Sequence, residues 1–180
     1  LKKVNGVYVP AAGNIVVNTE RVSFAITAYD RYTGSTNQNG IYEASLFDDG
    51  VEIAGFQLDS ISYTDTRYLN AHIDYKLRAN GGSYLQHLSR LPGNKSSIYT
   101  TNASNGIIDL ETKQAHAVKI NVSDPNGNTS SIRFNITSSG TSAATKPEAA
   151  QASQQFNPGF INIFSNEQIR FVPPEHALYD

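Results

Sequence analysis

Residues 116–136, HAVKINVSDPNGNTSSIRFNI, decide the fold class, because two alternating segments flank a single turn. Apolar side chains stand at every second position on both sides of that turn: Val118, Ile120, Val122, Ile132, Phe134 and Ile136. A period of two puts one apolar row on the buried face of a β-strand. Asn126-Gly127 between them accepts the positive φ angles of a tight turn. The stretch predicts a β-hairpin of residues 115–123 and 130–137.

The same signals recur along the first three quarters of the chain. Residues 41–47 and 51–58 predict a second hairpin over the sequence DDGV. The other predicted strands are residues 4–9, 14–17, 21–29, 84–89 and 106–110. Many short strands with closely spaced turns are typical of a two-layer sandwich. We therefore expect an all-β fold, an immunoglobulin-like antiparallel β-sandwich over residues 1–137.

The composition changes after Thr137. Residues 138–155, SSGTSAATKPEAAQASQQ, contain no large apolar side chain, so burial cannot offset their ordering entropy. We expect a linker there. Residues 156–180 return to a strand-like composition, but so short a segment cannot close a core of its own. They are expected to be the start of a second β domain or an extra strand docked on the first.

Charge and composition exclude several functions. The net charge of -2 gives no electrostatic reason to expect nucleic acid or an anionic membrane as partner. The absence of cysteine excludes disulfides, thiolate nucleophiles and cysteine-based zinc sites. No apolar run is long enough to predict a membrane span. Because the sequence begins with Leu1 and contains no methionine, we expect an excised or mature piece of a longer protein.

Residues 64–76, TDTRYLNAHIDYK, hold the densest group of chemically versatile side chains. Its candidate site residues are Arg67, Tyr68, Asn70, His72, Asp74 and Tyr75. A catalytic interpretation would use His72 as base, Asp74 as its orienting acid and Arg67 as an anion clamp. In a strand His72 and Asp74 would start about 7 Å apart, and in a helix they would diverge. No nucleophile motif such as Gly-x-Ser-x-Gly accompanies them, so no catalytic residue is predicted.

A metal site is also not predicted from these residues. His72 would have to pair with Asp74, His87 or His116, and none of these spacings matches the close histidine pairs of zinc sites. The sequence contains no acidic twelve-residue calcium loop either. We therefore expect no metal and no cofactor in this chain.

The spacing within the run favours a short crossover helix instead. One helical face carries Tyr68, Leu69, His72, Ile73 and Leu77. Thr64 or Asp65 would cap its start, and Asn80, with the two glycines after it, would end it. Such a helix would cover one end of the sandwich. The polar cluster would then tie the helix to neighbouring loops, because covered polar groups need hydrogen-bond partners.

Several stretches together resemble a known family. DTRYLNAHIDYKLR, LSRLPGNKSSIY, NGIIDL and the 116–136 hairpin are similar to a non-catalytic β-sandwich region of Bacteroidetes cell-envelope proteins. In those proteins it follows a lysostaphin-type (murein endopeptidase) zinc metallopeptidase domain. The resemblance covers residues 20–137, and its most specific part is the string at residues 67–75. The tail FINIFSNEQIRFVPPEHALYD resembles the start of the next β domain.

The resemblance implies a non-catalytic accessory domain that positions or gates the peptidase domain of the same chain. It implies the periplasm or cell envelope as the location and peptidoglycan as the parent's substrate. Zinc is expected only in the peptidase domain, which binds it through His-x-x-x-Asp and His-x-His motifs that this chain lacks. The alternatives are a glycan- or peptidoglycan-binding module with tyrosines stacking on sugars, and a self-standing enzyme, for which no matching residue set is found.

Overall fold

The computed structural model describes the backbone of residues 2–4 and 7–9, and backbone and side chains of residues 14–110, 114–140, 154–157 and 160–174. The chain divides into two compact units. The first comprises residues 1–91 with 95–142, and the second comprises residues 92–94 with 143–180. Among the described residues no helix has the length and apolarity needed to cross a membrane.

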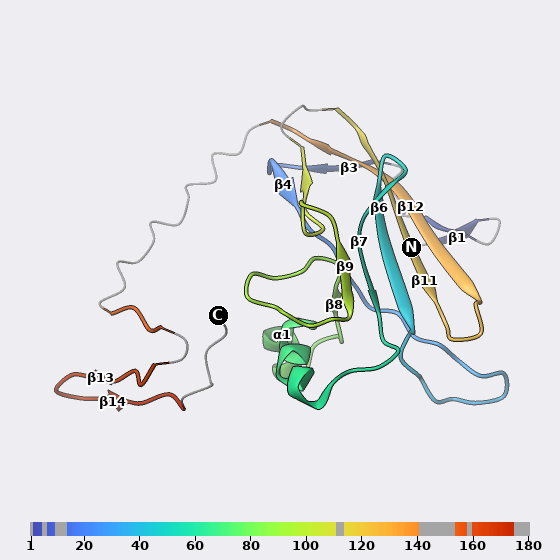
Figure 1. The fold of residues 1–180 in the computed structure, drawn as a ribbon. Coiled ribbons are helices and arrows are strands. Elements are labelled where there is room, and N and C mark those ends of the chain that lie inside the picture. The colour runs from blue at the N-terminus through green and yellow to red at the C-terminus, as the bar shows by residue number, and fades with distance from the viewer. Residues whose placement is uncertain are drawn as a thin grey trace. The chain divides into compact units, whose positions relative to one another are not determined.

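A mixed sheet, eight-stranded among the described residues, forms the body of the first unit (Figure 1). Its strands are β1 (Lys2–Val4), β2 (Val7–Val9), β3 (Asn14–Val17), β6 (Glu43–Asp48), β7 (Val51–Gln57), β9 (Tyr99–Thr101), β11 (His116–Ser123) and β12 (Thr129–Ser138). Their order is β1-β2-β12-β11-β6-β7-β9, with β3 also paired to β12. The mostly-β class is confirmed. The expectation of a purely antiparallel sheet is wrong, because β2 and β3 run parallel to β12.

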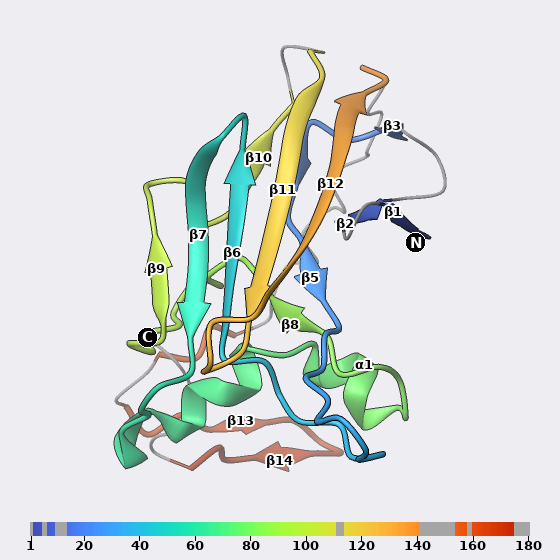
Figure 2. The ribbon, with the colours of Figure 1, turned by 90° about the vertical axis from the view of Figure 1, so that its right-hand side faces the viewer.

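Both predicted hairpins are present, and Figure 2 shows their four strands side by side. The turn between β6 and β7 consists of Asp49 and Gly50, with φ angles of 48° and 85°. Positive φ at both positions matches the twist of a tight hairpin. In the other turn the Asp124 carboxylate accepts backbone N–H bonds from Asn126 and Asn128, each at 2.9 Å. Local turn chemistry therefore sets both connections.

The predicted strand at residues 14–17 is confirmed as β3, whereas the other predicted strands differ from the structure in their limits. Residues 4–9 fall across β1 and β2, which form a small hairpin of their own. Residues 21–29 contain two short strands, β4 (Arg21–Val22) and β5 (Ala25–Ile26), instead of one. β4 pairs with β10 (Ile108–Asp109), and β5 pairs with β8 (Gln86–His87). The immunoglobulin-like arrangement of these strands stays a prediction.

The core lies where the β4, β5, β8 and β10 segments pack against the main sheet. From the sheet strands it contains Leu46, Phe56, Val118, Ile120, Phe134 and Ile136, and from outside them Leu88, Ile98, Ile108 and Leu110. Phe24 meets Phe134 edge-on, with ring centroids 5.5 Å apart. The alternating residues of the opening stretch thus supply the sheet side of the core, as their period of two predicts.

The predicted crossover helix is interrupted. A 3₁₀ helix, η1 (Tyr63–Ala71), is followed by a short α-helix, α1 (Tyr75–Ala79). Between them the carbonyl of His72 accepts from His87 N–H at 2.8 Å, and Asp74 N–H donates to the carbonyl of Leu85 at 2.9 Å. These backbone groups bond outside the helix, so the helical ladder cannot continue through them. The helical prediction for this segment is correct in type and wrong in continuity.

The predicted helix caps are also partly wrong. Ser62 precedes η1 and makes no side-chain cap, so neither Thr64 nor Asp65 acts as the N-cap. Asp74 instead caps α1, and its carboxylate accepts from Leu77 N–H at 2.9 Å. The predicted end before the glycine pair is confirmed.

The second unit contains a two-stranded ladder of β13 (Phe164–Ser165) and β14 (Arg170–Phe171). The Asn162 side chain donates to the carbonyls of Asn157 and Phe160 at 2.8 and 2.9 Å. Of the predicted linker, residues 141–153 lie outside the described residues, and Ser138 belongs to β12. The boundaries at 137 and 155 stay predictions.

Candidate functional site

His72 is the centre of the polar run at residues 64–76, and its side chain is enclosed. It is 2% exposed. Its ring meets those of Phe56 and Tyr99 edge-on, with centroids 4.6 and 5.7 Å away. Phe56 comes from β7 and Tyr99 from β9, so the helical segment is anchored on two neighbouring strands of the main sheet.

The hydrogen bonds of His72 define one tautomer of a neutral imidazole. The hydroxyl of Tyr99 donates to the carbonyl of His87 at 3.1 Å, and its oxygen lies 2.8 Å from His72 Nδ1. Because that hydroxyl proton is already used, the network assigns the ring hydrogen to Nδ1, which donates to Tyr99. Nε2 is then the acceptor for the Gln86 amide, 3.1 Å away. Both ring nitrogens of His72 are therefore occupied by the protein itself.

Burial of the His72 side chain favours its neutral form. Burial, with a smaller electrostatic contribution from His87, lowers the pKa of His72 from 6.5 to about 4. Burial also raises the pKa of Tyr99 above its ordinary value. A general base must reach a substrate proton, and this imidazole has no free nitrogen and almost no exposed surface. The arrangement braces the helical segment against the sheet.

The other predicted site residues have contacts and exposures of their own. Arg67 donates to the hydroxyl of its neighbour Tyr68 at 2.9 Å, and its guanidinium lies 4.8 Å from that ring's centroid. Asn70 is exposed. Asp74 caps α1, and the side chain of Tyr75 is 59% exposed. The hydrogen bonds of Arg67 to Tyr68, of Asp74 to Leu77 and of His72 to Gln86 and Tyr99 therefore have different partners.

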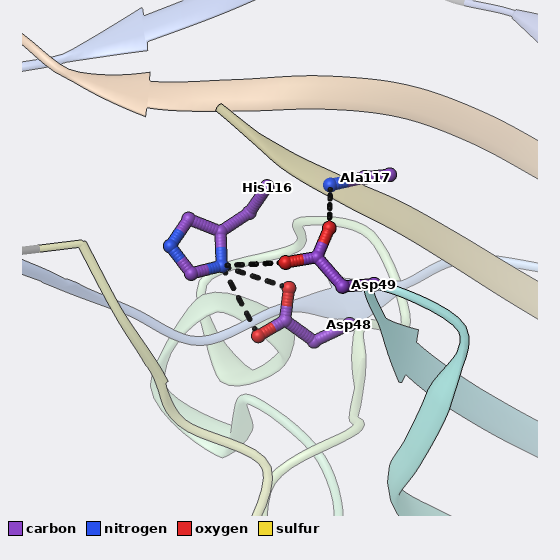
Figure 3. Close-up of polar contacts among 4 residues, drawn as sticks. All are labelled: Asp48, Asp49, His116 and Ala117. Atoms are coloured by element: carbon purple, nitrogen blue, oxygen red, sulfur yellow. Dashed lines mark hydrogen bonds and ion pairs between the residues drawn. The ribbon is translucent and has the colours of Figure 1, made fainter. Parts of the chain in front are cut away.

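A different group of titratable side chains does converge, at one end of β6 (Figure 3). Asp48 ends β6, Asp49 begins the following turn, and His116 begins β11. His116 Nδ1 lies 3.0 and 3.2 Å from the two carboxylate oxygens of Asp48. It lies 3.6 Å from Oδ2 of Asp49. We call these three residues the Asp–Asp–His cluster.

Backbone contacts hold the cluster in place. Oδ1 of Asp49 accepts from Ala117 N–H at 2.8 Å, and the backbone N–H of Asp49 donates to the carbonyl of Ala117 at 3.0 Å. The side chains of Asp48 and His116 are 20% and 16% exposed, and that of Asp49 is 58% exposed. The Nε2 atom of His116 is buried and has no hydrogen-bond partner among the described residues.

Neither this cluster nor the partners of His72 were predicted from the sequence. His116 was considered only as a metal-binding partner of His72, and Gln86 and Tyr99 were not among the candidate residues. The adjacent acids of the DDGV turn were visible as a turn signal, but His116 follows Asp48 by 68 positions. Only the pairing of β6 with β11, in which Asp48 faces Val118, brings them together. No local pattern encodes that pairing.

An open apolar groove lies beside the β11–β12 hairpin. It has a volume of about 620 Å³. Residues 24–28 line it together with Ile120, Val122, Ile132 and Phe134 of the sheet. Tyr29, 44% exposed, and Arg31 also line it. Ile120 and Phe134 are core residues with 5% and 9% exposure, so the surface open to contact with another molecule lies at less buried lining residues such as Tyr29.

Comparison with protein-family models, with curated proteins and with solved structures finds no match to this chain.

Proposed function

We propose that this chain is a non-catalytic accessory domain, with an immunoglobulin-like strand arrangement, of a cell-envelope zinc peptidase that acts on peptidoglycan. In this proposal it packs on the peptidase domain of the same protein and positions or gates it. The setting and the parent activity come from the resemblance of residues 20–137 to the region that follows such peptidase domains. The zinc of the parent belongs to the peptidase domain.

The observation that carries the non-catalytic role is the state of His72. The densest polar run of the chain centres on an imidazole that is 2% exposed and bonded at both nitrogens. A catalytic base must exchange protons with a substrate. The side chain of His72 instead joins the end of η1 to β8 and β9 by hydrogen bonds, which supports a structural role.

The groove beside the β11–β12 hairpin supports the docking role. Its lining is mainly apolar, with Tyr29 and Arg31 among its residues. An apolar centre next to aromatic and arginine side chains is the composition that protein interfaces favour. We therefore assign the groove to the contact with the peptidase domain.

The first test concerns chemistry. The purified chain should not hydrolyse peptidoglycan sacculi or a panel of muropeptides and glycans. Turnover that is retained after repurification and lost in His72→Gln would refute the non-catalytic assignment.

The identity of the parent protein is tested by the coding sequence upstream of Leu1. It should specify His-x-x-x-Asp and His-x-His motifs, and a different upstream domain would refute the proposed peptidase parent.

The second test concerns docking, and the chain offers a matched pair of tyrosines for it. Tyr29 lines the groove, whereas Tyr63 at the start of η1 is 91% exposed and lies outside the groove lining. The upstream peptidase domain, expressed separately, should bind this chain in calorimetry. Tyr29→Ala should weaken that binding at least several-fold, and Tyr63→Ala should leave it unchanged. Equal effects of the two variants, or no binding at all, would contradict docking through the groove.

A second candidate function is peptidoglycan binding, and the exposed tyrosines favour it. Tyr63 begins η1 and Tyr75 begins α1, and they are 91% and 59% exposed, as rings that stack on sugars must be. In this case the isolated chain should sediment with insoluble murein, and Tyr63→Ala should reduce the bound fraction while Tyr29→Ala should not. The accessory proposal expects no sedimentation, so one assay separates the two functions.

A further inference from the structure

The geometry points to a binding site for a divalent first-row transition metal ion, Zn²⁺, at the Asp–Asp–His cluster. The ligands would be Nδ1 of His116 and one carboxylate oxygen each from Asp48 and Asp49. The site lies where the β6–β7 turn meets the start of β11 (Figure 3). It does not depend on the proposed accessory function, because it concerns the fold of this chain alone.

The carboxylate oxygens around His116 outnumber the hydrogens that its Nδ1 can donate. Three carboxylate oxygens face Nδ1, at 3.0, 3.2 and 3.6 Å. A neutral imidazole offers them one hydrogen at this nitrogen, and 3.6 Å is beyond hydrogen-bond range. Oδ2 of Asp49 therefore faces the ring without a hydrogen bond to it. Two carboxylates next to one imidazole carry more negative charge than it balances, whereas a divalent cation would balance both.

The distances within the cluster can be compared with those of a zinc site. Zinc lies about 2.0–2.2 Å from nitrogen and oxygen ligands and prefers tetrahedral geometry. Two ligand atoms at a tetrahedral angle are then roughly 3.3–3.6 Å apart. The cluster has Nδ1 at 3.0 Å from Asp48 Oδ1 and at 3.6 Å from Asp49 Oδ2, and its ligand atoms all lie within 4.8 Å of one another. The two distances from Nδ1 thus lie on either side of the tetrahedral value.

The type of ligand selects the ion. Calcium and magnesium prefer ligand sets made only of oxygen, whereas imidazole combined with carboxylates suits zinc and its first-row neighbours. The backbone N–H of Ala117 already orients the Asp49 carboxylate through its other oxygen, the kind of support that metal ligands receive from surrounding groups. Three protein ligands leave the fourth position to water. The ion would join the β6–β7 turn to β11.

The test is titration of the 180-residue chain with ZnCl₂ near neutral pH, followed by calorimetry and by thermal unfolding with and without the metal. We expect one ion per chain and a higher Tm with zinc, because a ligand of the folded state raises its stability. Co²⁺ should bind competitively and show the visible absorption of a four-coordinate ion. His116→Gln and Asp49→Asn should each weaken binding by roughly tenfold or more. Asn at position 49 keeps an oxygen for Ala117 N–H, so this variant preserves the turn.

Two matched control variants distinguish binding at this site from nonspecific binding of Zn²⁺ elsewhere on the chain. His87→Gln removes another half-buried histidine, and Asp59→Asn removes an exposed carboxylate outside the cluster. Both should bind Zn²⁺ as the wild type does. Absence of binding by the wild type would overturn the site. So would a His116→Gln or Asp49→Asn variant with unchanged affinity, or controls that weaken binding as much as the cluster variants do.

Discussion

Acidification should destabilise this protein through His72, and the size of the effect follows from its burial. The pKa of His72 is about 4 in the folded chain, compared with its ordinary value of 6.5, which applies when the chain unfolds. Between these two values the unfolded state binds the proton and the folded state does not. The contribution of His72 to the free energy of unfolding is therefore fully present above about pH 6.5. It decreases as the pH falls and no longer changes below about pH 4.

The magnitude comes from the same difference. A change from 6.5 to about 4 is about 2.5 pKa units, each equivalent to roughly 1.36 kcal/mol. The free energy of unfolding should thus fall by about 3 kcal/mol across this window because of His72 alone. The free energy of unfolding of small domains is only about 5–15 kcal/mol. A loss of this size should therefore lower the urea concentration at the denaturation midpoint measurably.

Urea denaturation at pH steps through this window measures the effect, and His72→Gln isolates it. The variant lacks the titrating group but keeps His87, His116 and every carboxylate, so their contributions cancel in the difference between the two curves. The variant should be less stable at neutral pH and should show a shallower pH dependence. If both proteins lose stability in parallel on acidification, His72 is not held neutral by the fold, and the assigned hydrogen-bond network is wrong.

Three further changes test separate parts of the structure by equilibrium denaturation. Gly106→Ala should destabilise by roughly 2 kcal/mol or more, because φ is +81° and an added Cβ would lie 2.5 Å from a backbone oxygen; Gly127→Ala, with φ of +85° and open space, should cost only about 1 kcal/mol. Equal losses at the two glycines would show that the close contact is absent. Asp74→Ala should cost about 1 kcal/mol as a lost helix cap, and Asp59→Ala should cost almost nothing; the cap assignment fails if they match. Tyr99→Phe should cost roughly 1–3 kcal/mol by leaving buried polar groups unpaired, and an unchanged midpoint would remove Tyr99 from the network.

Local signals in the sequence were sufficient for the hairpins. A period-two pattern and a turn pair lie within about twenty residues in each case, so neither hairpin needs information from elsewhere in the chain. The same reasoning failed for residues 21–29, where one alternating run becomes β4 and β5. Alternation requires only that every second side chain is buried. It does not say which strand supplies the backbone partners, and here they come from β8 and β10.

The helical segment illustrates a similar limit. The spacing of its apolar residues predicted a helical face, which residues 63–79 largely form. The break between η1 and α1 comes from backbone bonds of His72 and Asp74 to residues 85–87, and their partners were not identifiable from spacing alone. Tertiary hydrogen bonds override a helical preference that amounts to a few tenths of a kcal/mol per residue.

The most instructive case is the contrast between the two histidines. His72 stood in the run that looked most chemical, and the fold encloses it among partners from β7, β8 and β9. His116 stood in an ordinary alternating strand, and the fold places it against two carboxylates near the surface. The run richest in polar side chains therefore marked a place where polar groups find hydrogen-bond partners inside the protein. The Asp–Asp–His cluster, in which carboxylate oxygens exceed the available hydrogens, arises because strand pairing joins residues 68 positions apart. The pairing of β6 with β11, and not the local composition, creates the proposed metal site.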